Sequence, residues 1–117
     1  MPSKRAEQAL FDIRDNVLLA RAFIEGLTEE AFEADLLRFY AVTRCLEIIS
    51  EASRRLPSAI RDRYPDLPWR AIMGVGNVYR HEYDNVEESY VWRTVQHHLS
   101  PLMTVVEAEI ARLANRS

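Results

Sequence analysis

The fold is decided by residues 36–56, which read LLRFYAVTRCLEIISEASRRL. Apolar side chains recur there every three or four residues, a spacing that predicts a helix with more than one apolar face. Such a helix lies at the centre of a bundle, or at the centre and also at a dimer interface. Pro57 is expected to end it.

A second amphipathic helix is predicted before this stretch. Its apolar stripe consists of Leu10, Ile13, Val17, Ala20 and Ile24. Gly26 is the type of residue that ends a helix, and Thr28 is the type that begins the next one.

The chain after Pro57 is also predicted to be helical. Residues 58–64 form a short helix, 65–68 a turn, and Trp69 begins a helix that contains Gly74 and Gly76 and ends at 81–85. A last helical region runs from Val86 to the C-terminus, with a bend near residues 100–101. We therefore expect a single all-α domain over residues 1–117, a bundle of four or five helices. The short chain and the apolar central helix favour a homodimer.

Composition narrows the possible functions. The 117 residues carry a net charge of −3, and no apolar run is long enough to span a membrane. The start of the chain has no apolar signal stretch, so we expect a cytoplasmic protein with no membrane partner, and DNA is not an expected ligand. Cys45 is the single cysteine, which excludes an intramolecular disulfide and a thiolate zinc site; we expect it to be a small buried side chain.

Positive charge is concentrated in residues 54–81, which carry a net charge of +4, and every basic residue there is arginine. Arginine makes forked contacts with phosphate, so this segment can meet RNA. Ion pairs within the chain explain the same charges equally well.

The stretch GVGNVYRHEY, residues 74–83, gathers the side chains best suited to chemistry. His81 can act as an acid or base near neutral pH, and Arg80 can bind a phosphate. On a continuous helix, Asn77 lies one turn before His81 and Gly76 one turn before Arg80. RNA cleavage needs an acid or base and a cation that binds the phosphate, and this stretch supplies both. The structural alternative is that His81 and Arg80 cap the last carbonyls of the helix.

No metal or cofactor is predicted. His97 and His98 are adjacent, so on a helix their rings point about 100° apart and do not share one ion. Glu47 and Glu51 are four residues apart on the central helix, where Arg44 can reach Glu47. We interpret Arg44, Glu47 and Glu51 as structural support for the site.

Three segments resemble the HepT-like family of the HEPN superfamily. They are residues 44–52 (RCLEIISEA), residues 68–74 (PWRAIMG), and residues 76–83 with the helix that follows through 102. The resemblance covers nearly the whole chain and implies a helical homodimer whose active site lies at the dimer interface. It also implies a metal-independent endoribonuclease, the toxin of a type VII toxin–antitoxin system. The implied partner is a nucleotidyltransferase antitoxin of the MntA type, which attaches AMP to the motif tyrosine.

The family motif is an arginine, four to six residues, a histidine, any residue and a tyrosine; His81 and Tyr83 match it. Gly76 stands where the motif arginine is expected. Arg80 is a candidate substitute, because on one helix face its long side chain fills the space above Gly76. The alternative is a helical homodimer without catalytic activity that binds a nucleotidyltransferase or a nucleotide.

Overall fold

A computed structural model describes residues 4–78 and 86–115, and within these ranges the regular structure is helical, with no strand. The elements are α1 (Lys4–Ile24), α2 (Glu29–Glu33), α3 (Leu36–Arg55), α4 (Ser58–Asp62), α5 (Trp69–Met73), α6 (Val86–Arg93), a π-helical turn η1 (Thr94–His98) and α7 (Ser100–Ala114). The all-α prediction is confirmed. The long helices give the molecule an elongated shape of 49 × 25 × 22 Å.

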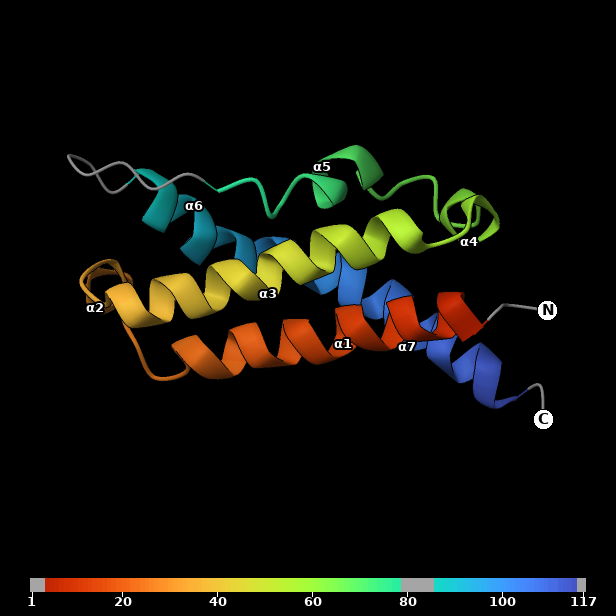
Figure 1. The fold of residues 1–117 in the computed structure, drawn as a ribbon, viewed down its shortest axis with the longest axis horizontal. Helices are drawn as coiled ribbons and strands as arrows, with labels where there is room; N and C mark the ends of the chain where they lie inside the picture. Colours follow the sequence, from red (N-terminus) through yellow and green to blue (C-terminus); the bar gives the residue numbers. More distant parts are fainter. Residues whose placement is uncertain (1–3, 79–85, 116–117) are drawn as a thin grey trace.

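Helices α1 and α3 form an antiparallel pair along the long axis of the molecule (Figure 1). The predicted apolar stripe of α1 is buried against α3 and α7. Gly26 has a φ of +79°, a left-handed conformation that glycine adopts without strain. The Thr28 hydroxyl accepts the Ala31 N–H at 3.1 Å, so both predicted helix boundaries are confirmed.

The central helix α3 begins at a cap that the sequence analysis did not identify. The Asp35 carboxylate accepts the Arg38 N–H at 3.0 Å, which satisfies one of the free backbone donors at this end. The helix ends at Arg55, two residues before Pro57. Cys45 is buried within it, as expected.

Behind this pair, α6, η1 and α7 form a third long segment (Figure 1). The bend expected near residues 100–101 follows the π-helical turn, and Pro101 lies in the first turn of α7. The Phe32 ring lies 6.3 Å from that of Phe39 and 5.7 Å from that of Trp92. These aromatic contacts join α2, α3 and α6.

The helix that was predicted to run from Trp69 to residues 81–85 ends earlier than expected. Helix α5 ends at Met73, and residues 74–76 turn. Two glycines within three residues weaken a helix, and here the chain packs on α3 instead of continuing the helix. The helical spacing that placed Asn77 relative to His81, and Gly76 relative to Arg80, therefore does not hold for residues 74–78.

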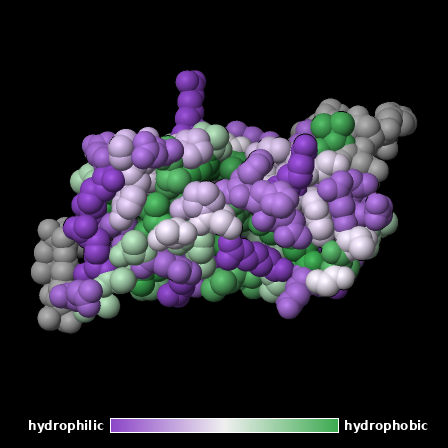
Figure 2. All heavy atoms as spheres, turned by 180° about the vertical axis from the view of Figure 1, so that it is seen from behind, coloured by the Kyte–Doolittle hydropathy of each residue, from purple (hydrophilic) through white to green (hydrophobic). Residues whose placement is uncertain are grey.

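Several large apolar side chains are exposed on the described surface: Leu18, Leu19 and Phe23 on α1, Leu36, Leu37 and Tyr40 on α3, and Val86. Figure 2 shows the molecule from the side opposite to the view of Figure 1, and on this side apolar areas are interrupted by hydrophilic side chains. None of the described helices is both long and apolar enough to cross a bilayer. The exposed side chains of α1 and α3 are consistent with the predicted homodimer, which stays a prediction.

Candidate functional site

The predicted site residues fall into two groups. Arg80, His81 and Tyr83 lie within residues 79–85, outside the described residues. Asn77 is described and is exposed, in the segment that leads directly into that motif. The surroundings of Asn77 therefore define the part of the site that the structure places.

A groove of about 210 Å³ lies between α3 and the segment after α5. Its lining residues are Arg44, Glu47, Ser50, Glu51, Arg54, Gly76 and Asn77. The structure thus brings Asn77 together with Arg44, Glu47 and Glu51, the three residues that the sequence analysis interpreted as support for the site. Charged and amide groups dominate this groove, so it suits a polar ligand.

The charges in the groove are open to solvent. Arg44 Nη1 lies 3.9 Å from Glu47 Oε2, which confirms that Arg44 reaches Glu47 along the helix. The two side chains are 65% and 48% exposed, so their ion pair contributes little to stability. Both groups are therefore available to a ligand or to another chain.

Two residues of this groove were missed by the sequence analysis. The Ser50 hydroxyl accepts the Gly76 N–H at 2.6 Å, and Arg54 Nη2 donates to the Met73 carbonyl at 2.7 Å. Ser50 is 2% exposed, so this hydroxyl is almost fully buried at the wall of the groove. The signal in the sequence that could have identified this pair was a serine at a core position of the helix, four residues before Arg54.

Gly76 lies directly against the backbone of α3. A Cβ atom built at Gly76 would be 2.6 Å from the Cα atom of Glu47 and 2.9 Å from Ser50 Oγ. The glycine thus allows a close approach to α3, and the direction in which its side chain would point is occupied by that helix. Arg80 lies outside the described residues, so its role as a substitute for the motif arginine stays a prediction.

Three arginines of the basic segment, residues 54–81, bind groups within the chain. Arg55 binds Asp12 at 2.8 Å, Arg63 binds Glu109, and Arg54 binds the Met73 carbonyl. These contacts favour the structural explanation of the positive charge for three of its arginines. Arg70 is exposed on α5.

The histidine pair and the cysteine considered in the sequence analysis lie in surroundings that are typical of surface and core residues. His97 and His98 are exposed, and among residues 4–78 and 86–115 no cluster of three or more His, Cys, Asp or Glu side chains could hold a metal. Burial raises the pKa of the Cys45 thiol, which disfavours the reactive thiolate.

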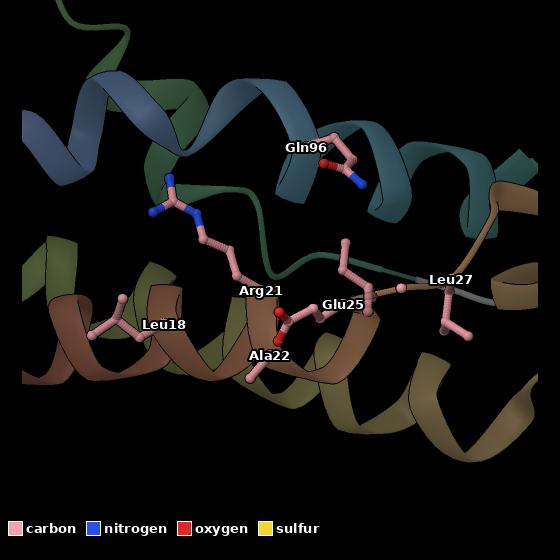
Figure 3. Close-up of a pocket in the computed structure, with 8 residues that line it drawn as sticks. Leu18, Arg21, Ala22, Glu25, Leu27 and Gln96 are labelled. Atoms are coloured by element: carbon pink, nitrogen blue, oxygen red, sulfur yellow. The ribbon is translucent and has the colours of Figure 1, made fainter.

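A larger cavity of about 410 Å³ lies between the C-terminal end of α1 and the π-helical turn (Figure 3). Arg21, Glu25 and Gln96 supply its polar groups, and Leu18 and Leu27 supply apolar walls. None of the predicted site residues lines it. We place the candidate site in the smaller groove, because Asn77 lines it and precedes His81 by four residues in the sequence.

The model of the family described as "Ribonuclease HepT-like" matches residues 13–109, which include the groove and the motif. The chain belongs to the HepT-like ribonuclease family. This finding confirms the family that the three sequence segments indicated. The family match spans all helices from α2 to η1 in full and most of α1 and α7.

Named relatives of this HepT-like chain include proteins from archaea. "Probable ribonuclease HepT" of Thermococcus cleftensis is 32% identical over 80% of this chain and 84% of its own length. "Putative RNase MJ1216" of Methanocaldococcus jannaschii is 31% identical over 85% of this chain and 82% of its own. "Putative RNase MJ0125" of the same organism is 29% identical over 99% of this chain and 100% of its own. No solved structure matches the chain.

Proposed function

We propose that this HepT-like protein is an endoribonuclease that cleaves RNA without a metal ion. The observation that supports this most strongly is the family match over the groove and the adjoining motif with His81 and Tyr83. The named relatives are described as ribonucleases, which supports RNA as the substrate class.

In the proposed reaction, the His81 imidazole removes the proton of a ribose 2′-hydroxyl, and the 2′ oxygen attacks the adjacent phosphorus. The Arg80 guanidinium and the Asn77 amide stabilise the negative charge that develops on the phosphoryl oxygens. The bond to the 5′ oxygen breaks, and the imidazolium returns its proton to that oxygen. The products are a 2′,3′-cyclic phosphate and a 5′-hydroxyl end. Arg44, Glu47 and Glu51 support the site through the groove.

We further propose that the protein is the toxin of a type VII toxin–antitoxin system and works as a cytoplasmic homodimer. Its partner is a nucleotidyltransferase of the MntA type. The Tyr83 phenol attacks the α-phosphorus of ATP, pyrophosphate leaves, and the partner's base takes the phenol proton. The attached AMP places a bulky anion two residues from His81, where it competes with RNA for the same cation.

The test of the nuclease uses purified protein, a single-stranded RNA oligonucleotide and EDTA. We expect cleavage to yield cyclic-phosphate ends, to persist in EDTA, and to be lost in His81→Ala. His98→Ala, which removes an exposed histidine of η1, is the matched control and should cleave normally. Intact RNA with the wild-type chain, or cleavage by His81→Ala at the wild-type rate, would contradict the proposal.

The test of the modification is intact-mass spectrometry after co-expression with a nucleotidyltransferase encoded beside this protein. We expect the mass to rise by one AMP group in the wild-type chain and in Tyr40→Phe, and to stay unchanged in Tyr83→Phe. Tyr40 is the matched control because it is a tyrosine that is 56% exposed. An increase that survives Tyr83→Phe rejects Tyr83 as the acceptor.

One observation favours a second function. Gly76 stands where the family motif has arginine, so a helical dimer that binds the nucleotidyltransferase or a nucleotide without cleaving RNA is the alternative. Stable complex formation with the partner, together with intact RNA in the nuclease assay, would select it.

A further inference from the structure

Two hydrogen bonds fasten residues 73–76 to α3. Arg54 Nη2 donates to the Met73 carbonyl at 2.7 Å, and the Gly76 N–H donates to Ser50 Oγ at 2.6 Å. Between these bonds, the Val75 side chain is 8% exposed and belongs to the core. The segment before the motif is therefore held on one stretch of α3 and is not a free loop.

The hydroxyl of Ser50 is used differently from that of its neighbour Ser53. Both serines are buried on α3, at 2% and 0% exposure. Ser53 Oγ donates to the Ile49 carbonyl at 2.7 Å, a bond within the helix. Ser50 instead accepts a backbone N–H from 26 residues further along the chain. Of the two serines, Ser50 is therefore the one that links α3 to the segment before the motif.

The two glycines of this segment also differ. At Gly76 a Cβ would lie 2.6 Å from Glu47 Cα, and this backbone atom of a central helix cannot move aside. At Gly74 the nearest atom to a Cβ is the Ala71 carbonyl oxygen at 3.6 Å, an ordinary contact. The arrangement seen here therefore requires glycine at 76 but not at 74.

We propose that Ser50 and Gly76 together form an anchor that holds residues 73–76, the segment from which the motif continues, on α3, with Ser50 as a positioning residue for the ribonuclease. This inference rests on the proposed function. His81 follows Gly76 by five positions in the sequence, so their Cα atoms are at most about 18 Å apart even if the chain is fully extended. A displacement of the anchor therefore changes where the chain carries His81 relative to the groove residues on α3.

The anchor also gives the substitution at position 76 a physical meaning. An arginine side chain at 76 would begin with a Cβ inside the contact with Glu47 and Ser50. Gly76→Arg, which restores the family motif, is therefore expected to displace residues 73–77 and to lower activity. Because Gly76 makes this close contact with α3, we do not expect its replacement by arginine to restore activity.

The first experiment compares Ser50→Ala with Ser53→Ala by amide hydrogen exchange and by RNA cleavage kinetics. In Ser50→Ala we expect exchange of the Gly76 amide to rise about tenfold, because its acceptor is gone. We expect kcat to fall about tenfold, since small misplacements of reacting groups are costly, while KM changes less than about twofold. Ser53→Ala should show wild-type exchange at Gly76 and wild-type kcat.

The second experiment compares Gly76→Ala with Gly74→Ala. The added methyl group should speed amide exchange across residues 73–77 and lower kcat in Gly76→Ala only. Equal effects of the two glycine substitutions, or of the two serine substitutions, would overturn the positioning role.

The failure of this inference is distinguishable from the failure of the proposed function. If the wild-type chain leaves RNA intact, the nuclease proposal fails and the role of Ser50 in catalysis fails with it. The exchange measurements then report separately whether the anchor exists, because they need no substrate. If the wild-type chain is active and Ser50→Ala frees the Gly76 amide without changing kcat, the nuclease stands and the positioning role is wrong.

Discussion

The hydroxyl of Tyr64 donates a 2.6 Å hydrogen bond to Glu109, whose carboxyl group is 3% exposed. Arg63 binds the Oε1 atom of the same carboxylate, and Arg112 Nε lies 3.8 Å from its Oε2 atom. These contacts tie the chain after α4 to α7, two segments that are 45 residues apart. A buried carboxylate that lost these partners would remain desolvated, so each partner is important for stability.

We predict that Tyr64→Phe lowers the free energy of unfolding by about 2 kcal/mol, because it removes one hydrogen bond to a charged acceptor. Urea denaturation at a fixed protein concentration measures this loss. Tyr40→Phe, which removes an exposed hydroxyl, should change the free energy by less than about 0.5 kcal/mol. Equal losses in the two variants would show that the bond to Glu109 contributes nothing.

The same carboxylate makes stability depend on pH. Burial raises the pKa of Glu109, but the hydrogen bonds from Arg63 and Tyr64 outweigh it, so the pKa lies below the ordinary value of 4.5. A depressed pKa in the folded state contributes stability that is present above pH 4.5 and is lost as the pH falls through the folded pKa. We expect Glu109→Gln to be less stable than wild type at pH 7. Its unfolding free energy should fall less steeply below pH 4.5, and a parallel decline in both proteins would contradict this.

The aromatic contacts of Phe32 predict a large loss when the ring is removed. Phe32 is completely buried between Phe39 and Trp92, so Phe32→Ala should cost about 4 kcal/mol. Because this variant can fail to fold, Phe32→Leu provides a graded measurement, with an expected loss of about 1 kcal/mol. Thermal unfolding followed by circular dichroism gives both values. A wild-type melting temperature in Phe32→Ala would refute the packing role.

The predicted homodimer can be tested on the exposed apolar side chains of α3. Leu37 is 79% exposed and Leu36 is 49% exposed, and neighbouring exposed apolar side chains are typical of a surface that another chain covers. A stable interface buries about 1,600 Å² in total, so a charge at its centre should be disruptive. We expect light scattering at micromolar concentration to report a dimer for the wild type and a monomer for Leu37→Asp. Ala108→Asp, at an exposed position of α7, should remain dimeric; a monomeric wild-type chain would contradict the prediction.

Local patterns in the sequence were sufficient for most of the helices and for much of the core. Helical periodicity, the Thr28 cap and the Gly26 stop depend on residues within one or two turns of each other, so they can be recognised in the sequence. The end of α5 was mispredicted for the opposite reason. Whether a glycine-containing segment continues a helix depends on what packs against it, and here that partner is α3.

The features of the candidate site also divide into those that local sequence predicts and those that depend on tertiary packing. The sequence by itself determined the family, and it predicted the chemistry of the motif and the support from Arg44, Glu47 and Glu51, because these depend on residue type and short spacing. Only the tertiary structure decided that Gly76 lies directly against α3, that Ser50 holds its N–H, and that Glu109 is buried with Tyr64 and Arg63. Each of these contacts joins residues at least 26 positions apart, and such distances are set by how helices pack, which no local pattern encodes.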